Sequence, residues 1–194
     1  MPAVRFWFDP VCPYSWPTAE WLHEAVGGPE ALEWELMSLA ILNEGRELPA
    51  RATARMRDSR SAGRLFASLA REVDGTRLWE ALRAFNGLYH RDGAVLDEPS
   101  MRTMLRMLGL PPGHAASIAD RSLDSAVSDA HARSQEAAGG SGGSPLIALG
   151  DTVFHGPILR TVPDAAAGRA LFDALGTVAS VDAFTSVQRL RPPT

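Results

Sequence analysis

The apolar residues near the start of the chain repeat with the periods of a strand, a helix and a second strand. Residues 4–8 are β-branched and aromatic, and Asp9-Pro10 ends them, which predicts a short buried strand. A helical stripe of apolar residues follows Pro13, which suits the first turn of a helix, and Gly27-Gly28 ends it. Residues 32–36 then alternate between apolar side chains and glutamates. The pattern indicates a βαβ unit.

The pattern becomes helical in the middle of the chain, where strand formers are few. Asp97 followed by Pro99 is typical of a helix start. Apolar spacing predicts four helices, around residues 65–73, 78–89, 97–108 and 123–137. This block is interpreted as a helical insertion in an α/β fold.

Strand character returns toward the end of the chain. Pro145–Leu149 and Thr152–His155 are joined by Gly150-Asp151, which predicts a hairpin, and a last helix is expected over residues 165–175. We therefore expect an α/β domain interrupted by a helical block. The expected boundaries are 1–48 and 139–194 for the α/β domain and 49–138 for the insertion.

The composition is that of an ordinary globular protein, with 45% hydrophobic and 22% charged residues. A net charge of −4 argues against nucleic acid as a partner, because phosphate binding needs a concentrated basic surface. No apolar run approaches the roughly 20 residues that cross a bilayer, and the first strand leaves no room for a signal peptide. The single cysteine excludes an internal disulfide. We expect a cytoplasmic protein without a membrane partner.

That cysteine, Cys12, lies between the first strand and the following helix. A lone cysteine is most often a small core residue, but the end of a strand in an α/β fold is where such folds place their sites. The unpaired amides and the dipole at a helix start favour an anion, and the thiolate is the nucleophilic form of cysteine. We expect an exposed, ionised sulfur that receives the amides of Tyr14 and Ser15 and the Ser15 hydroxyl.

Ser15 decides which thiol chemistry is open to Cys12. In a Cys-x-x-Cys site the second thiol displaces whatever is bound to the first. Serine cannot do so, and Ser15 occupies that position. The sequence therefore favours one-thiol chemistry, in which an outside thiol releases the group bound to Cys12.

A glycine-rich stretch, residues 139–144, precedes Pro145. A phosphate-binding loop follows a strand and carries a lysine, whereas this stretch follows a helix and has none. The sharper prediction is a cis peptide bond at Ser144-Pro145, since only X-Pro bonds adopt cis at low cost. It would place the Ser144 backbone opposite Cys12.

Other residues are weaker candidates. Tyr14 and Trp16 offer flat contact area for an aromatic substrate. Asn43 ends the second strand, where contact with a thiol cofactor and a role in a turn are equally good interpretations. His155 follows the hairpin strand near Pro145 and could approach the substrate, although a plain surface histidine is the commoner case. No histidine has a partner at zinc-like spacing, so no metal site is expected.

Three motifs resemble one known family. Phe-Trp-Phe-Asp-Pro-Val-Cys-Pro, Met-Ser-Leu-Ala-Ile-Leu-Asn-Glu and Phe-His-Gly-Pro-Ile-Leu resemble the actinobacterial mycothiol-dependent nitroreductases, within the DsbA type of thioredoxin fold. The resemblance implies a thioredoxin-like domain with a helical insertion, in a cytoplasmic and often dimeric reductase. It implies that Cys12 is the nucleophile and that Pro145 is the cis-proline beside it. Members of the family commonly have a second cysteine where this chain has Ser15.

The expected function is a thiol-dependent oxidoreductase that uses Cys12, with Ser15, Pro13, Tyr14 and Trp16 around it, and mycothiol or glutathione as co-substrate. The expected substrates are disulfides or small, aromatic electrophiles, and no metal is needed. Two alternatives stay open. Pro-Tyr-Ser-Trp at residues 13–16 also matches kappa-class glutathione transferases and chromene-carboxylate isomerases, in which a serine stands at the Cys12 position. The site could instead be a non-catalytic redox-sensing thiol.

Overall fold

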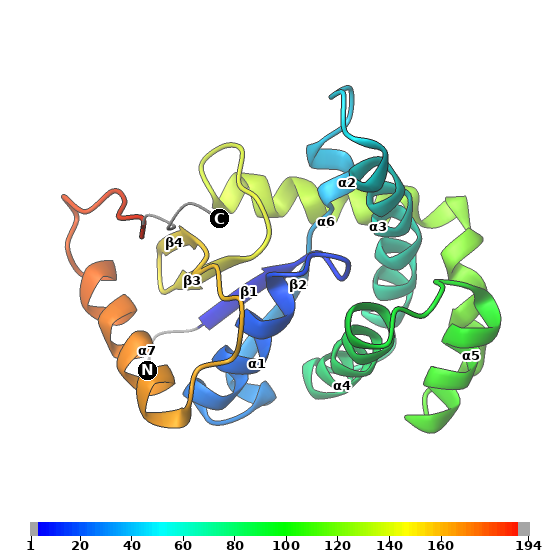
Figure 1. The fold of residues 1–194 in the computed structure, drawn as a ribbon, viewed down its shortest axis with the longest axis horizontal. Helices are drawn as coiled ribbons and strands as arrows, with labels where there is room; N and C mark the ends of the chain where they lie inside the picture. Colours follow the sequence, from blue (N-terminus) through cyan, green and yellow to red (C-terminus); the bar gives the residue numbers. More distant parts are fainter. Residues whose placement is uncertain (1–3, 190–194) are drawn as a thin grey trace.

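A four-stranded sheet forms the centre of the computed structural model, which describes residues 4–189 (Figure 1). The strand order is β2-β1-β3-β4, with β1 parallel to β2 and antiparallel to β3, and β3 antiparallel to β4. The strands are β1 Val4–Phe8, β2 Leu32–Leu36, β3 Leu146–Leu149 and β4 Thr152–His155. The expected βαβ unit and hairpin are therefore confirmed.

The helices also follow the expected spacing, with shifted ends. The α-helices are α1 Ser15–Val26, α2 Leu39–Leu42, α3 Ala50–Leu69, α4 Gly75–Asn86, α5 Glu98–Met107, α6 Asp124–Ala137 and α7 Ala165–Ala179. Shorter helical turns are η1 Pro29–Ala31, η2 Gly87–Arg91, η3 Pro112–Ala119 and η4 Arg121–Leu123, of which η2 is a π-helix. The second strand was expected to continue as far as Asn43, but it ends at Leu36, and the run that follows is helical: Ser38 caps α2 by accepting the Ile41 amide at 3.3 Å.

The two faces of the sheet carry different apolar clusters. On one face, Phe6 packs edge-on against Trp34 at 5.5 Å between ring centroids, and Phe8 against Phe66 of α3 at 5.6 Å. On the other face, Trp7 packs with Met37, Leu146 and Ala148, close to the end of α6. The alternation of side chains along β1 is what sends its aromatic residues to both faces.

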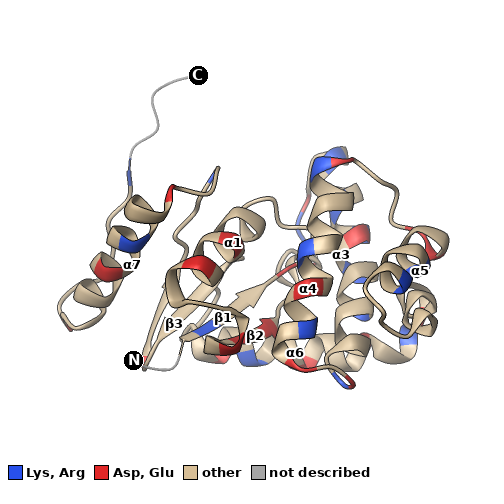
Figure 2. Ribbon diagram, turned by 90° about the horizontal axis from the view of Figure 1, so that it is seen from below, with Lys and Arg blue, Asp and Glu red and all other residues tan. Residues whose placement is uncertain are grey.

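Helices α3 to α6 lie on the β2 side of the sheet, whereas α7 lies beside α1 on the β3 and β4 side (Figure 1). Basic and acidic residues are interspersed along these helices (Figure 2). None of the helices within residues 4–189 is long and apolar enough to cross a membrane. The domain boundaries stay a prediction, and their outermost residues, 1–3 and 190–194, lie outside the described part.

Candidate functional site

Cys12 lies in the connection between β1 and α1, at the carboxyl end of β1. Its amide donates to the Asp9 carbonyl at 3.0 Å, and its own carbonyl accepts the Ser15 amide at 3.2 Å. These two consecutive turns delay the helix, which begins at Ser15 with Tyr14 as its N-cap residue. Pro13 therefore precedes the helix, whereas the sequence had led us to expect it in the first turn.

The Cys12 sulfur is buried, with 3% of the residue exposed, and it contacts a backbone carbonyl. Its S–H can donate to the Ser144 carbonyl oxygen, which lies 3.3 Å away. The expected exposure was therefore wrong, and so was the expected hydroxyl donor: the Ser15 hydroxyl pairs with Ser144 Oγ at 2.6 Å. The Ser15 amide is bonded to the Cys12 carbonyl and not to the sulfur. A carbonyl oxygen only accepts hydrogen bonds, so it suits the S–H and offers no donor to an anion.

Ser144 joins the three segments that surround the sulfur. Its peptide bond to Pro145 is cis, as expected. Its carbonyl faces Cys12, and its hydroxyl oxygen accepts the Asp9 amide at 2.9 Å and pairs with the Ser15 hydroxyl. The end of β1, the start of α1 and the segment before β3 are therefore held together by one side chain and its carbonyl.

We expect Ser144→Ala to lower the free energy of unfolding by about 1–3 kcal/mol, because the buried Asp9 amide loses its acceptor. Ser141→Ala changes an exposed serine of the same segment and should change that free energy by less than about 0.5 kcal/mol. Urea unfolding followed by circular dichroism measures both. Equal effects of the two substitutions would contradict the joining role of Ser144.

His155 lies at the end of β4, exposed, with its imidazole over the glycine-rich segment. A Cβ added at Gly143 would lie 2.9 Å from His155 Nε2, so the ring sits directly against the residue before Ser144. A second cis bond, which the sequence did not predict, follows at Gly156-Pro157. His155 is thus brought to the cis-proline segment, and the structure places Gly143 between it and Ser144.

Asp9 is a residue of this site that the sequence suggested only as part of a turn. Its carboxylate is fully buried and accepts the Val11 amide at 2.9 Å, the Leu39 amide at 2.6 Å and the Ser59 hydroxyl at 2.5 Å. Burial raises the pKa of the Asp9 carboxyl above its usual range, although all three donors oppose that shift. Asp9 links the Cys12 turn to α2 and α3. An aspartate that directly follows a buried strand was the signal available in the sequence.

His90 is a second residue of the site that was not among the sequence candidates. Its Nε2 lies 3.1 Å from the Pro10 carbonyl oxygen, two residues before Cys12, and its ring stacks on Trp16 at 6.0 Å between centroids. Burial lowers the pKa of His90, so the neutral imidazole is favoured. His90 belongs to the π-helix η2, a type of distortion frequent at functional sites. Nothing in the local sequence predicts this contact across 80 positions.

The remaining candidates from the sequence lie in two places: beside Cys12 in the chain, and in α2. Pro13, Tyr14 and Trp16 are partly exposed and follow Cys12 in the chain by one, two and four residues. Asn43 is turned toward its own helix: its side-chain amide donates to the Leu39 carbonyl at 2.8 Å and lies 3.8 Å from the Met56 sulfur. Of the two roles considered for Asn43, contact with a thiol cofactor or stabilisation of a turn, these bonds support the turn. Within residues 4–189, no group of three or more potential ligands could hold a metal ion.

The fold is shared with several proteins of known structure. A 2-hydroxychromene-2-carboxylate isomerase superposes with a TM-score of 0.61 at 15% identity, covering 90% of this chain and 95% of that one. The cytosolic disulfide reductase DsbM from Pseudomonas aeruginosa, solved with GSH, gives 0.59 at 15% identity, covering 90% and 98%. A probable DsbA oxidoreductase from Streptomyces coelicolor gives 0.55 at 16% identity, covering 98% and 94%. These likenesses establish a DsbA-type thioredoxin fold.

The family comparison extends over most of the chain. Residues 11–189 match the Rv2466c-like family, described as mycothiol-dependent nitroreductase Rv2466c. The matched region includes Cys12, the helical segment and the cis-proline segment at Ser144. A low-molecular-weight thiol is the co-substrate that this family name implies. The protein is thus a thiol-dependent oxidoreductase of the DsbA type and belongs to the Rv2466c-like family of mycothiol-dependent nitroreductases.

Proposed function

We propose that the protein reduces small disulfides or small electrophiles by one-thiol chemistry at Cys12, with mycothiol as co-substrate. The observation that carries the proposal is a single cysteine whose sulfur lies 3.3 Å from the carbonyl of a cis Ser-Pro peptide, with a serine three residues on. Because the chain has one cysteine, no internal thiol can complete a catalytic disulfide. A cytoplasmic location, with its supply of reduced thiols, fits this chemistry.

The proposed cycle has two exchange steps at Cys12. Cys12 loses its proton to solvent, turns away from the Ser144 carbonyl and attacks a disulfide, so that one sulfur becomes bonded to Cys12 and the other leaves as a thiolate. A thiolate of the co-substrate then attacks the bound sulfur and forms a new small disulfide, which restores the Cys12 thiolate. A second co-substrate thiolate then attacks this mixed disulfide and frees the remaining substrate thiolate, so that two co-substrate thiols become one disulfide and pass two electrons to the original disulfide. Ser15 takes no part in bond making; it holds Ser144 in place.

The surroundings of Cys12 support a flat substrate. Trp16 and His90 stack beside the turn that carries Cys12, and Tyr89 meets His90 edge-on at 4.9 Å. Neutral aromatic faces of this kind favour offset or edge-on contact with an aromatic ring. We therefore expect small aromatic electrophiles among the substrates. The homodimer expected from the sequence stays a prediction, which light scattering of the purified protein tests.

Intact-mass analysis after incubation with mycothiol disulfide tests the proposal. The wild type should gain one mycothiol, added reduced mycothiol should remove it and restore the free Cys12 thiol, and Cys12→Ala should gain nothing. An adduct that added thiol does not release would support a redox-sensing thiol in its place. The absence of any adduct would favour the isomerase or transferase alternative and would contradict the proposal.

A further inference from the structure

An open groove near the glycine-rich segment is not used by the chemistry described above. It has a volume of ≈ 530 Å³, within the range of small-molecule sites. The groove is lined by Ile41, Leu42, His131, Gln135, Glu136, Gly140 and Ser141, and we call it the His131 groove. Cys12 does not line it, so the groove could hold the body of a ligand but not its reacting sulfur.

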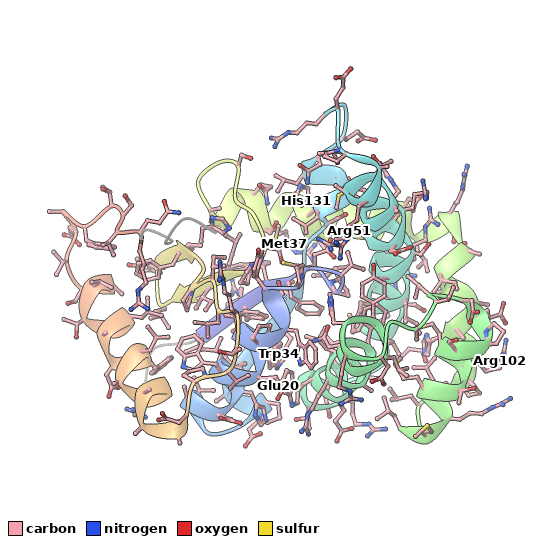
Figure 3. The ribbon with its side chains drawn as sticks, viewed as in Figure 1. Glu20, Trp34, Met37, Arg51, Arg102 and His131 are labelled. Carbon is pink, nitrogen blue, oxygen red and sulfur yellow. The ribbon has the colours of Figure 1, made fainter. Side chains whose placement is uncertain are left out.

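His131 supplies a free hydrogen-bond donor to this groove. The residue is 7% exposed, and its Nδ1 lies 3.4 Å from the Ser38 amide. Because Nδ1 accepts that amide proton, the ring proton of neutral His131 sits on Nε2. Within residues 4–189, His131 Nε2 makes no hydrogen bond and is not a fully buried atom, so it is open to solvent, and His131 is one of the residues that line the groove. Figure 3 shows His131 near Met37, the neighbour of Ser38.

The charge of the groove disfavours an anionic ligand. Burial lowers the pKa of His131, which favours its neutral form at neutral pH. Glu136 supplies an exposed carboxylate, and none of the arginines within residues 4–189 lines the groove. A carboxylate-bearing thiol such as glutathione would meet Glu136 without a cation to pair with. Hydroxyl groups, in contrast, can accept from His131 Nε2–H and donate to Glu136 and Ser141.

Hydrogen bonds connect the lining of the groove to the segments around Cys12. Gln135 accepts the Gly142 amide at 2.8 Å and donates to the Gly142 carbonyl at 3.2 Å, two residues before Ser144. On the α2 side of the groove, Ile41 lies two residues after Leu39, whose amide is bonded to the Asp9 carboxylate. Both sides therefore continue into segments that contact the Cys12 turn. The apolar side chains of Ile41 and Leu42 suit the C–H face of a saturated ring.

We propose that the His131 groove binds the neutral, hydroxyl-rich body of a thiol co-substrate whose sulfur reacts at Cys12. This inference rests on the proposed function, because it assigns a place to the co-substrate. Mycothiol has this chemistry: its cysteine is attached to a glucosamine–inositol pair, which carries hydroxyl groups and no carboxylate. The groove would thus select a polyol thiol over glutathione.

The test uses unreactive ligands, so that binding is separated from reaction at Cys12. Isothermal titration should show that the wild type binds S-methyl mycothiol at least about tenfold more tightly than S-methyl glutathione. His131→Asn keeps an oxygen acceptor for the Ser38 amide but lacks the Nε2 donor. It should weaken S-methyl mycothiol binding by about three- to tenfold and leave S-methyl glutathione binding unchanged. The His131 imidazole signal in ¹H–¹⁵N NMR should shift only with S-methyl mycothiol.

Ser128→Ala, an exposed change on the same helix outside the groove, is the matched control and should bind both ligands as the wild type does. If His131→Asn loses affinity equally for both ligands, or for neither, the proposal that the His131 groove binds the co-substrate is wrong. If S-methyl mycothiol binds selectively but mycothiol disulfide forms no adduct, the proposed function fails and the groove stands. If the adduct forms but His131→Asn has no selective effect, the groove fails and the proposed function stands.

Discussion

Ser15→Cys is expected to release the thiol bound to Cys12 without any added reductant. The substitution places a second sulfur at the first residue of α1, one turn after Cys12. That introduced thiol can attack the mixed disulfide from within the protein, which expels the bound thiol and leaves an internal disulfide between Cys12 and the new sulfur. Because a neighbouring group acts at a far higher effective concentration than an external thiol at about 1 mM, release should be at least about 100-fold faster.

Ser15→Ala is the matched control for this result. Both substitutions remove the hydroxyl that pairs with Ser144 Oγ, and only one adds a thiol. The mass of the purified adduct is followed over time after the free thiol has been removed. Ser15→Ala should keep its adduct as the wild type does. Slow release from Ser15→Cys, at the rate of Ser15→Ala, would show that residues 12 and 15 do not meet and would contradict the one-turn geometry of the site.

Asp9→Ala is expected to have the largest effect on stability, lowering the free energy of unfolding by about 3–5 kcal/mol. The change leaves the buried Val11 amide, the half-buried Leu39 amide and the Ser59 hydroxyl without their acceptor, and each buried group left unsatisfied costs about 1–3 kcal/mol. Asp129→Ala, on the exposed surface of α6, should cost less than about 0.5 kcal/mol. Urea unfolding of both variants measures the difference. Similar values for the two would mean that Asp9 does not join the Cys12 turn to α2 and α3.

The charge of Asp9 should also appear in the pH dependence of stability. Burial raises the pKa of the folded carboxyl above its ordinary value of 3.8, so the folded state holds a proton at pH values where the unfolded state has lost it. Stability relative to the uncharged Asp9→Asn variant should therefore be greatest below pH 3.8, fall as pH rises toward the raised pKa, and level off above it. Urea titrations at several pH values compare the two proteins. If the stability of the wild type relative to Asp9→Asn increased with pH, the prediction would be contradicted.

Several elements were predictable because local pattern decides them. The two-residue period of residues 32–36 and the aspartate before Pro99 produced a strand and a capped helix at the expected places. The cis bond at Ser144-Pro145 was expected because of the special chemistry of proline and a family resemblance. The start of α1 was misplaced, since the turns at Asp9 and Cys12 depend on backbone bonds that no propensity reports.

The elements, their order and the presence of one thiol followed by a serine can be read from the chain alone. Hydrophobic periodicity and turn residues act over a few positions, so they can be recognised in the local sequence. The surroundings of that thiol, in contrast, exist only in the folded molecule. Ser144 meets Cys12 across 132 positions and His90 meets Pro10 across 80, and such contacts arise from the packing of the insertion and the sheet. The same packing buried the sulfur and turned the Ser15 hydroxyl toward Ser144, because a side chain takes its partner from its neighbours in space.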